Sequence, residues 1–290
     1  MSVKYNVCEY KRVKNCSVKC DVYPGSAEAP VAVYIHGGAL IFGGRGGIPD
    51  AVLEPVLKAG YWVASIDYRL APETKLPEII GDVRDALDWI RGEGRERFGY
   101  DAGRMAVMGG SAGGYLTLMT GTFDKKPKAL VSLYGYGDLL GDWYCKPSPH
   151  YCEHPLVPQE DALKLINLYE LSEVDNFNRF NIYLWSRQTG TWTGLVSGYD
   201  VQSEKEKIEK YCPILNISDD YPPTILLHGD KDTDVPYEQS LDMYNALKAR
   251  GRVAELVTYA GGGHGFDNNQ SDQNIPGIID RALAFMGAHV

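Results

Sequence analysis

The sequence predicts an α/β fold in which a mostly parallel central sheet carries helices on both faces and an inserted, mainly helical cap. Continuous β-branched and apolar runs, typical of strands buried on both faces, alternate along the chain with segments of helical period. This alternation of strand and helix indicates a parallel sheet. Residues 139–211 interrupt the alternation and are too long for an ordinary loop, which predicts the cap.

The length and charge of the chain limit its function. Its 290 residues suit one large α/β domain, or one domain with an insertion, and 44% of them are apolar. The net charge of −9 argues against a nucleic-acid partner, because binding to phosphates needs a basic surface. No apolar run reaches transmembrane length, and residues 1–8 lack the apolar centre of a secretory signal. We therefore expect no membrane partner, and the six scattered cysteines predict reduced thiols in a cytoplasmic protein.

The elements follow in order along the chain. Residues 7–23 predict an antiparallel pair of strands, and apolar runs predict further strands at 31–35, 62–66, 105–108, 130–134, 224–227 and 254–259. Apolar residues at helical spacing predict helices at 77–91, 237–250 and 277–287. We therefore expect a core of residues 1–138 and 212–290. In the cap, residues 139–211, we expect one helix over 162–169 and another over 204–211.

A serine stands at the end of one predicted strand. Residues 109–113 read Gly-Gly-Ser-Ala-Gly and directly follow the apolar run at 105–108. This G-x-S-x-G pattern is typical of a tight strand-to-helix turn that exposes a serine hydroxyl. Gly109 and Gly113 suit this turn, because a side chain there would collide with the neighbouring strand or helix. Ser111 is therefore the candidate nucleophile.

A serine hydroxyl needs an adjacent base, and the base needs a carboxylate to orient it. His264 lies in a glycine-rich loop directly after the last predicted strand, where it can reach over the sheet edge. Asp232 lies a few residues beyond the strand at 224–227, with Asp234 as the next candidate. We expect Asp230 and Asp234 to make turn or helix-cap bonds instead. Ser111, Asp232 and His264 are the predicted catalytic residues.

A third part of such a site binds the negative charge that develops on the substrate. Backbone N–H groups aimed at one point perform this task. The turn after the strand at 31–35 and the residue after the nucleophile are in position to supply them. The candidate oxyanion-hole residues are Gly37, Gly38, Ala39 and Ala112.

With these residues in place, the chain resembles an α/β-hydrolase of the hormone-sensitive-lipase-like esterase group, and also feruloyl and acetyl esterases. The resemblance rests on the segments at 36–38, 67–73, 109–114, 228–236 and 264–266, and covers about residues 28–138 and 212–287. It implies the α/β-hydrolase fold, no cofactor and no metal. It also implies hydrolysis of carboxylic esters with small to medium acyl groups by Ser111, Asp232 and His264, in this chain order.

The chain departs from the family pattern at two positions. Ala39 stands where the family usually has a third glycine, and its methyl group narrows the floor of the pocket. Gly110 stands before the serine, where the family often has an acidic residue. Outside these motifs, Arg69 follows a strand and Asp82 lies on a predicted helix. We expect them to form a structural ion pair.

The cap contains two clusters whose roles stay open. Its aromatic residues either line an acyl or aryl pocket or form the cap's own core, because both have the same composition: Trp143, Tyr144, Trp185 and Trp192. Four potential metal ligands lie within ten residues, but their spacing matches no zinc motif: Cys145, His150, Cys152 and His154. We expect free thiols there, with a Cys145–Cys152 disulfide as the alternative.

The sequence therefore predicts a cofactor-free serine carboxylesterase that acts on a small-molecule ester through an acyl-enzyme. An amidase, an aryl formamidase or a small-peptide hydrolase would use the same three residues. A non-catalytic ligand receptor on the same scaffold is the alternative from another class, although such proteins typically lose one of the three. A homodimer is a further open alternative.

Overall fold

The structure, a computed structural model, describes residues 3–174, 176–269 and 271–290, so the first two residues of the N-terminal segment considered above lie outside it. An eight-stranded sheet forms its centre, in the order β1-β2-β4-β3-β5-β6-β7-β8. The pairs β1–β2 and β2–β4 are antiparallel, and the pairs from β4–β3 to β7–β8 are parallel. The strands are β1 (Asn6–Val13), β2 (Cys16–Tyr23), β3 (Pro30–Ile35), β4 (Trp62–Ile66), β5 (Asp101–Gly110), β6 (Ala129–Leu133), β7 (Thr224–Gly229) and β8 (Ala254–Tyr259).

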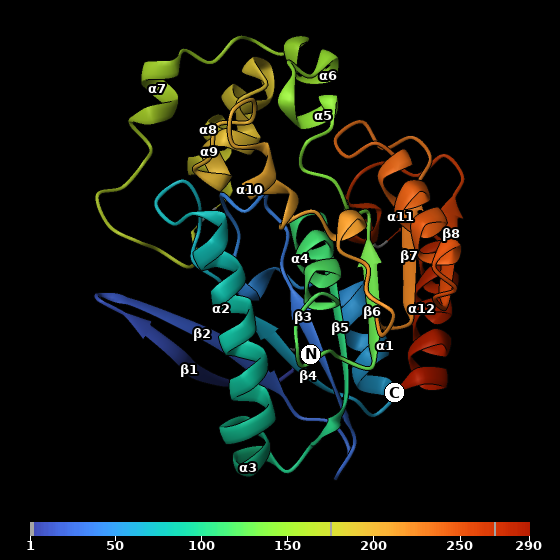
Figure 1. Cartoon of the computed structure of the whole chain (residues 1–290). Helices are drawn as coiled ribbons and strands as arrows, with labels where there is room; N and C mark the ends of the chain where they lie inside the picture. The colour runs from blue at the N-terminus through green and yellow to red at the C-terminus, as the bar shows by residue number, and fades with distance from the viewer. Residues whose placement is uncertain (1–2, 175, 270) are drawn as a thin grey trace.

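Helices cover both faces of the sheet (Figure 1). α1 and α12 pack on one face, whereas α2, α4 and α11 pack on the other. The helices are α1 (Asp50–Lys58), α2 (Leu76–Trp89), α3 (Arg95–Phe98), α4 (Ala112–Thr120), α5 (Asp142–Cys145), α6 (Pro149–Cys152), α7 (Gln159–Leu163), α8 (Asn176–Thr189), α9 (Trp192–Ser197), α10 (Lys205–Glu209), α11 (Glu238–Ala249) and α12 (Ile275–His289). The predicted α/β-hydrolase fold is confirmed in this architecture.

Strand β3 shows why the central strands read as continuous apolar runs. Val31, Val33 and Ile35 enter the core on the α2 and α4 face, whereas Ala32 and Tyr34 enter the core on the α1 and α12 face. Successive side chains of a strand point to opposite faces, and helices cover both. Every position must therefore be apolar, which removes the alternation of polar and apolar residues.

The segment between β6 and β7 holds helices α5 to α10 and lies beyond the carboxyl ends of the parallel strands (Figure 1). We call residues 139–211 the insert. The helix expected over 162–169 is wrong, because α7 ends at Leu163. Past that point the backbone N–H of Asn167 donates to Glu73 Oε1 at 2.7 Å instead of to a helical carbonyl, and Leu168 is fully exposed. The expected second helix is present as α10.

The longest helix of the insert, α8, is joined to the core by a buried arginine. Arg179 donates to Glu73 at 2.6 and 2.7 Å, to the Ile41 carbonyl at 2.8 Å and to the Ala71 carbonyl at 2.7 Å. Both members of the ion pair are only 3% exposed. Burial disfavours the charged carboxylate, but the bonds from Arg179 outweigh this effect and lower the pKa of Glu73.

The predicted structural pair of Arg69 and Asp82 is confirmed. Arg69 Nε and Nη2 donate to the two carboxylate oxygens at 2.7 and 2.8 Å, and both side chains are buried. Lys11 of β1 contacts the same carboxylate at 2.6 Å. The pair therefore fastens the chain after β4 and the edge strand β1 to helix α2.

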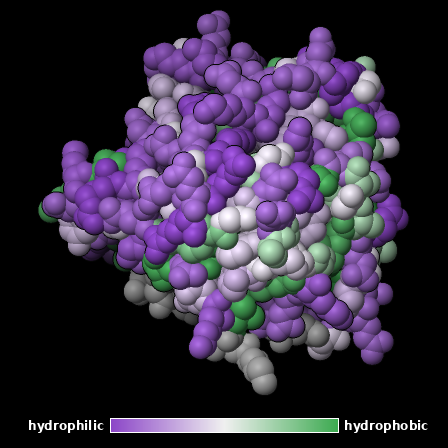
Figure 2. All heavy atoms as spheres, turned by 90° about the horizontal axis from the view of Figure 1, so that it is seen from below, coloured by the Kyte–Doolittle hydropathy of each residue, from purple (hydrophilic) through white to green (hydrophobic). Residues whose placement is uncertain are grey.

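The end of the molecule opposite the insert is covered mainly by hydrophilic side chains around a smaller group of paler and apolar residues (Figure 2). Such scattered apolar groups are ordinary on a folded surface. Within residues 3–174, 176–269 and 271–290, no helix combines the length and the apolar character needed to cross a membrane.

Replacing Arg179 with methionine tests the link between insert and core. The substitution leaves the Glu73 carboxylate buried without its partner, so we expect the free energy of unfolding to fall by about 3–5 kcal/mol. Urea denaturation followed by circular dichroism measures this change. The control is Lys164→Met, which removes an exposed pair with Glu160 and should leave the midpoint unchanged. A wild-type midpoint for Arg179→Met would contradict the prediction.

Candidate active site

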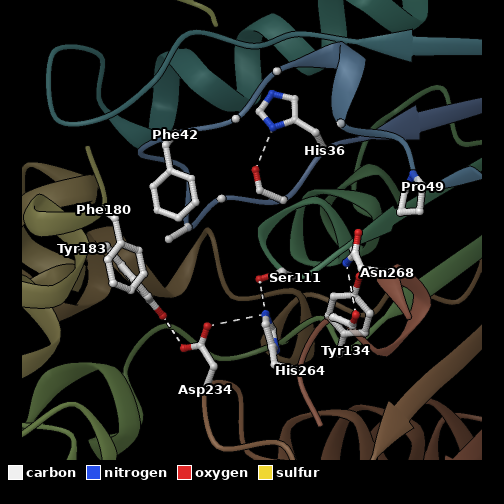
Figure 3. Close-up of a pocket in the computed structure, with 18 of the residues that line it drawn as sticks. His36, Phe42, Pro49, Ser111, Tyr134, Phe180, Tyr183, Asp234, His264 and Asn268 are labelled. Atoms are coloured by element: carbon white, nitrogen blue, oxygen red, sulfur yellow. Dashed lines mark hydrogen bonds and ion pairs between the residues drawn. The ribbon is translucent and has the colours of Figure 1, made fainter. Parts of the chain in front are cut away.

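Ser111 occupies the sharp turn between β5 and α4. Its backbone has φ 57° and ψ −121°, a conformation that L-residues rarely adopt. The Ser111 N–H donates to the Leu133 carbonyl of the neighbouring strand β6 at 2.9 Å, and the Ser111 carbonyl accepts from Tyr115 N–H at 3.0 Å. These two bonds hold the strained turn from both sides, and the hydroxyl faces the pocket (Figure 3).

The glycines of the turn are required by close backbone contacts, as the sequence predicts. A Cβ atom on Gly113 would lie 1.9 Å from the Ile35 carbonyl oxygen, and one on Gly109 would lie 2.5 Å from the same atom. Gly110 lies against a side chain instead of the backbone. A Cβ atom there would lie 2.6 Å from the Tyr134 hydroxyl oxygen.

The structure brings the three predicted catalytic side chains into one hydrogen-bonded chain. His264 Nε2 lies 3.0 Å from Ser111 Oγ, and His264 Nδ1 lies 2.7 Å from Asp232 Oδ2. Ser111 follows β5, Asp232 follows β7 and His264 follows β8, so the three meet at the carboxyl edge of the sheet. The geometry fits a hydroxyl, a base and a carboxylate that orients the base.

Asp232 is fully buried, and its negative charge is compensated from two sides. Oδ1 accepts the backbone N–H groups of Asp234 and Val235, each at 2.9 Å. Burial opposes ionisation, but hydrogen bonds from His228 and His264 outweigh it and hold the pKa of Asp232 far below its ordinary value. Asp232 is therefore a fixed anion at neutral pH.

A second carboxylate also faces the imidazole of His264. Asp234 Oδ2 lies 3.5 Å from His264 Nε2, on the nitrogen that also faces Ser111 (Figure 3). Burial lowers the pKa of His264, but Asp234, Asp232 and Asp267 outweigh this effect, so that the net shift is upward. The expectation that Asp234 makes turn or helix-cap bonds is wrong. Its Oδ1 accepts from Arg187 at 2.7 Å and from the Tyr183 hydroxyl.

The candidate oxyanion-hole residues lie beside Ser111. The Gly37 carbonyl accepts from His36 Nδ1 at 2.7 Å, and the Gly38 carbonyl accepts from Ile41 N–H at 2.8 Å. A trans peptide points each carbonyl and the following N–H in opposite directions. The N–H groups of Gly38 and Ala39 therefore point away from these bonds. The Ala112 N–H belongs to the first turn of α4, where helical N–H groups have no acceptor in their own helix.

The loop after β3, which carries Gly38 and Ala39, is held by the insert at every second residue. Trp192 Nε1 donates to the Ala39 carbonyl at 3.1 Å and Arg179 Nε to the Ile41 carbonyl at 2.8 Å. Further along, Val174 N–H donates to the Gly43 carbonyl at 3.1 Å, and Arg45 pairs with Glu173. Ala39 and Leu40 both have positive φ angles, of 54° and 62°, which such residues keep only where the surroundings enforce them.

These residues surround a cavity of about 980 Å³. Aromatic side chains from the loop after β3 and from the insert form much of its wall, with Phe42 facing Phe180 at a ring distance of 6.2 Å (Figure 3). Charged groups enter it at Glu173 and Asp234. The sequence did not single out the remaining aromatic lining residues, Tyr34, Tyr134, Tyr151 and Tyr183.

The four aromatic residues considered for the pocket do not line this cavity: Trp143, Tyr144, Trp185 and Trp192. Their assignment to the substrate pocket is therefore corrected. Tyr144 stacks between Trp143 and Trp192 at ring distances of 3.6 and 3.8 Å, and Tyr144 and Trp192 are buried. Three of the four thus belong to the core of the insert, where they pack around the guanidinium of Arg187 or against each other.

The Cys and His cluster of the insert separates into single contacts. Among the described residues, no three metal-ligating side chains gather into a site. Cys145 and Cys152 are free thiols; Cys145 contacts the Leu139 carbonyl at 3.5 Å, and Cys152 contacts the Gln188 carbonyl at 3.8 Å. His150 and His154 lie edge to face at 5.5 Å, and only His150 lines the cavity.

A serine at a strand-to-helix turn, with a histidine and an aspartate from later strand ends of a mostly parallel sheet, defines the chain as an α/β-hydrolase. The family described as BD-FAE has a model that matches residues 21–247. The chain belongs to this family.

The chain is also similar to three individual proteins. The chain is 28% identical over 255 residues to the esterase LipC of Mycobacterium tuberculosis, a match over 82% of this chain and 53% of that protein. It is 26% identical to the non-reducing polyketide synthase ausA of Aspergillus calidoustus, over 92% of this chain and 13% of the synthase. An α/β-hydrolase superfamily protein from Enterococcus faecalis shares the fold, with a TM-score of 0.73, 21% identity and coverage of 99% and 100%. The chain thus spans about half the length of LipC.

Replacing Asp234 with asparagine tests the electrostatics at His264. The charged groups around this imidazole are Asp232, Asp234 and Asp267, and the charge of Asp234 is the largest single cause that raises the pKa of His264. Its neutralisation removes a negative charge beside the imidazolium, so we expect the pKa of His264 to fall. An NMR titration of the imidazole signals measures it. In the control, Glu173→Gln neutralises another carboxylate of the same cavity and should leave this pKa in place. An unchanged pKa in the Asp234 variant would contradict the prediction.

Proposed function

We propose that the chain is a serine carboxylesterase that hydrolyses small to medium carboxylic esters through an acyl-enzyme. The observation that carries the proposal is the chain of two hydrogen bonds from Ser111 through His264 to the buried Asp232. The similarity to the esterase LipC supports it. The cavity beside Ser111 adds support, since its aromatic walls suit an acyl or aryl group.

In the proposed reaction, Ser111 Oγ attacks the ester carbonyl while His264 Nε2 accepts its proton. Asp232 holds the imidazole in the tautomer with a proton on Nδ1 and stabilises the imidazolium. The N–H groups of Gly38, Ala39 and Ala112, with Gly37 adjacent, receive the charge on the carbonyl oxygen. His264 then protonates the leaving alcohol, and a water molecule repeats the cycle on the acyl-enzyme.

The raised pKa of His264 has a consequence for the pH dependence. His264 acts as a base only when neutral, so kcat/KM falls as the pH drops through this pKa. Neutralising Asp234 lowers the pKa and therefore moves this acidic limb to lower pH.

The domain division at 139–211, the homodimer and the cytoplasmic location stay predictions.

Replacing Ser111 with alanine removes the proposed nucleophile. We expect kcat to fall by a factor on the order of 10⁴ or more. The measurement is hydrolysis of p-nitrophenyl esters from acetate to dodecanoate, with wild type beside the variant. Rates should be highest for short chains and decline with the length of the acyl group. Circular dichroism shows whether the variant is folded. A folded wild type that hydrolyses none of these esters would refute the proposal.

Replacing Trp192 with phenylalanine tests whether the insert positions the oxyanion hole. The variant loses the hydrogen bond to the Ala39 carbonyl, which helps to hold the strained backbone of Ala39. We expect kcat to fall by about tenfold or more with little change in KM, because the donors act on the transition state.

Trp143→Phe is the matched control for this variant. Trp143 belongs to the same aromatic stack, and its Nε1 has no partner among the described residues. The Trp143→Phe variant should therefore keep the wild-type kcat. Equal losses of kcat in both variants would contradict the prediction, because they would arise from the packing of the insert and not from the hydrogen bond to Ala39.

A further inference from the structure

Asp234 is held in the cavity by two groups of the insert. Arg187 Nη1 and the Tyr183 hydroxyl both donate to Oδ1, and Arg187 Nη2 also donates to the Asp234 backbone carbonyl at 3.2 Å. Arg187 is 2% exposed and lies between four aromatic rings, so its position is fixed. With Oδ1 engaged, Oδ2 faces His264 Nε2 at 3.5 Å (Figure 3).

The position of Oδ2 relates it to one part of the substrate. In the mechanism proposed above, His264 Nε2 transfers a proton from Ser111 to the leaving atom, which must therefore lie within hydrogen-bond reach of Nε2. Asp234 Oδ2 borders the same nitrogen from the cavity side. The leaving atom of the substrate and Asp234 Oδ2 would thus both lie next to His264 Nε2.

Esters and amides differ at this atom. The leaving oxygen of an ester carries no hydrogen, whereas the leaving nitrogen of a secondary amide carries an N–H. When the nitrogen lone pair turns toward Nε2–H to accept its proton, this N–H turns away and needs its own acceptor. A desolvated donor without a partner costs about 1–3 kcal/mol. A site that supplies the acceptor removes this obstacle.

We propose that Asp234 Oδ2 accepts the N–H of the leaving group, so that the chain hydrolyses secondary aryl amides in addition to esters. The inference rests on the function proposed above, because the same Ser111, His264 and Asp232 carry out the reaction. Ser111 Oγ forms a bond to the carbonyl carbon, and its proton passes to His264 Nε2 and then to the nitrogen. The C–N bond breaks, the arylamine leaves, and water converts the acyl-enzyme to the free acid.

The test compares three substrates with one acyl and one aryl group: p-nitrophenyl acetate, p-nitroacetanilide and its N-methyl derivative, which lacks the N–H. We expect the wild type to hydrolyse the ester and the anilide, with the N-methyl anilide much slower than the anilide.

In Asp234→Asn, Arg187 retains the side-chain oxygen as its acceptor and the NH₂ group turns toward the leaving group. Two donors then face each other.

We therefore expect Asp234→Asn to lower kcat/KM for the anilide at least about tenfold more than kcat/KM for the ester. The assays are run above the pKa of His264, so that the shift of this pKa does not enter. The preference for the anilide over its N-methyl derivative should disappear in the variant. In the control Glu173→Gln, the ratio of anilide to ester hydrolysis should stay at its wild-type value.

The outcomes separate the two proposals. Ester hydrolysis without any anilide hydrolysis would overturn the inference and leave the esterase proposal intact. Equal losses for ester and anilide in Asp234→Asn would also overturn it, because Asp234 would then act only on the imidazolium. No hydrolysis of any substrate would instead refute the esterase proposal.

Discussion

The site depends on how closely helix α4 approaches the end of strand β3. The Ile35 carbonyl oxygen leaves room for a hydrogen, but not for a methyl group, on Gly109 and Gly113. This approach places the first N–H groups of α4 beside the loop that follows β3. It also forces Ser111 into its strained conformation, because the chain must reverse within one residue between strand and helix. The proposed nucleophile and the proposed donors for the oxyanion are thus brought together by one steric fit.

The insert takes part in this arrangement from the other side. Its residues bond to positions 39, 41, 43 and 45 of the loop after β3, so the conformation of the loop is set from outside as well as by its own glycines. A second contact reaches the proposed base, because Arg187 and Tyr183 hold Asp234 beside His264. The proposed donors and the proposed base therefore both rest on side chains of the insert.

The sequence predicted those parts of the molecule that local patterns determine. The central strands are buried on both faces, and their apolar runs stand out. Ser111, Asp232 and His264 follow strand ends, where the fold gathers them at one edge of the sheet. Helix α8 escaped prediction because its buried side chains include arginine, serine and glutamine, which break the apolar period. The two arginines and Gln188 are buried because they bond to groups far away in the chain, which no local pattern reveals.

The same reason explains the errors at the site. Aromatic residues of the insert have the composition of a pocket wall and of a core alike, and only their stacking around Tyr144 decides between the two. Asp234 looks like a turn residue until Arg187, 47 positions away, is placed beside it. The positive φ angles of Ala39 and Leu40 are equally invisible in the sequence, because neither residue favours that conformation.

The two buried arginines of α8 also bear on how such a segment can be exchanged between proteins. Arginine keeps its charge in the interior, so Arg179 and Arg187 each require a carboxylate that the core supplies, Glu73 and Asp234. A chimera that received a foreign insert without these arginines would bury two unmatched anions. Grafting either the insert or the core therefore requires both halves of each ion pair to move together.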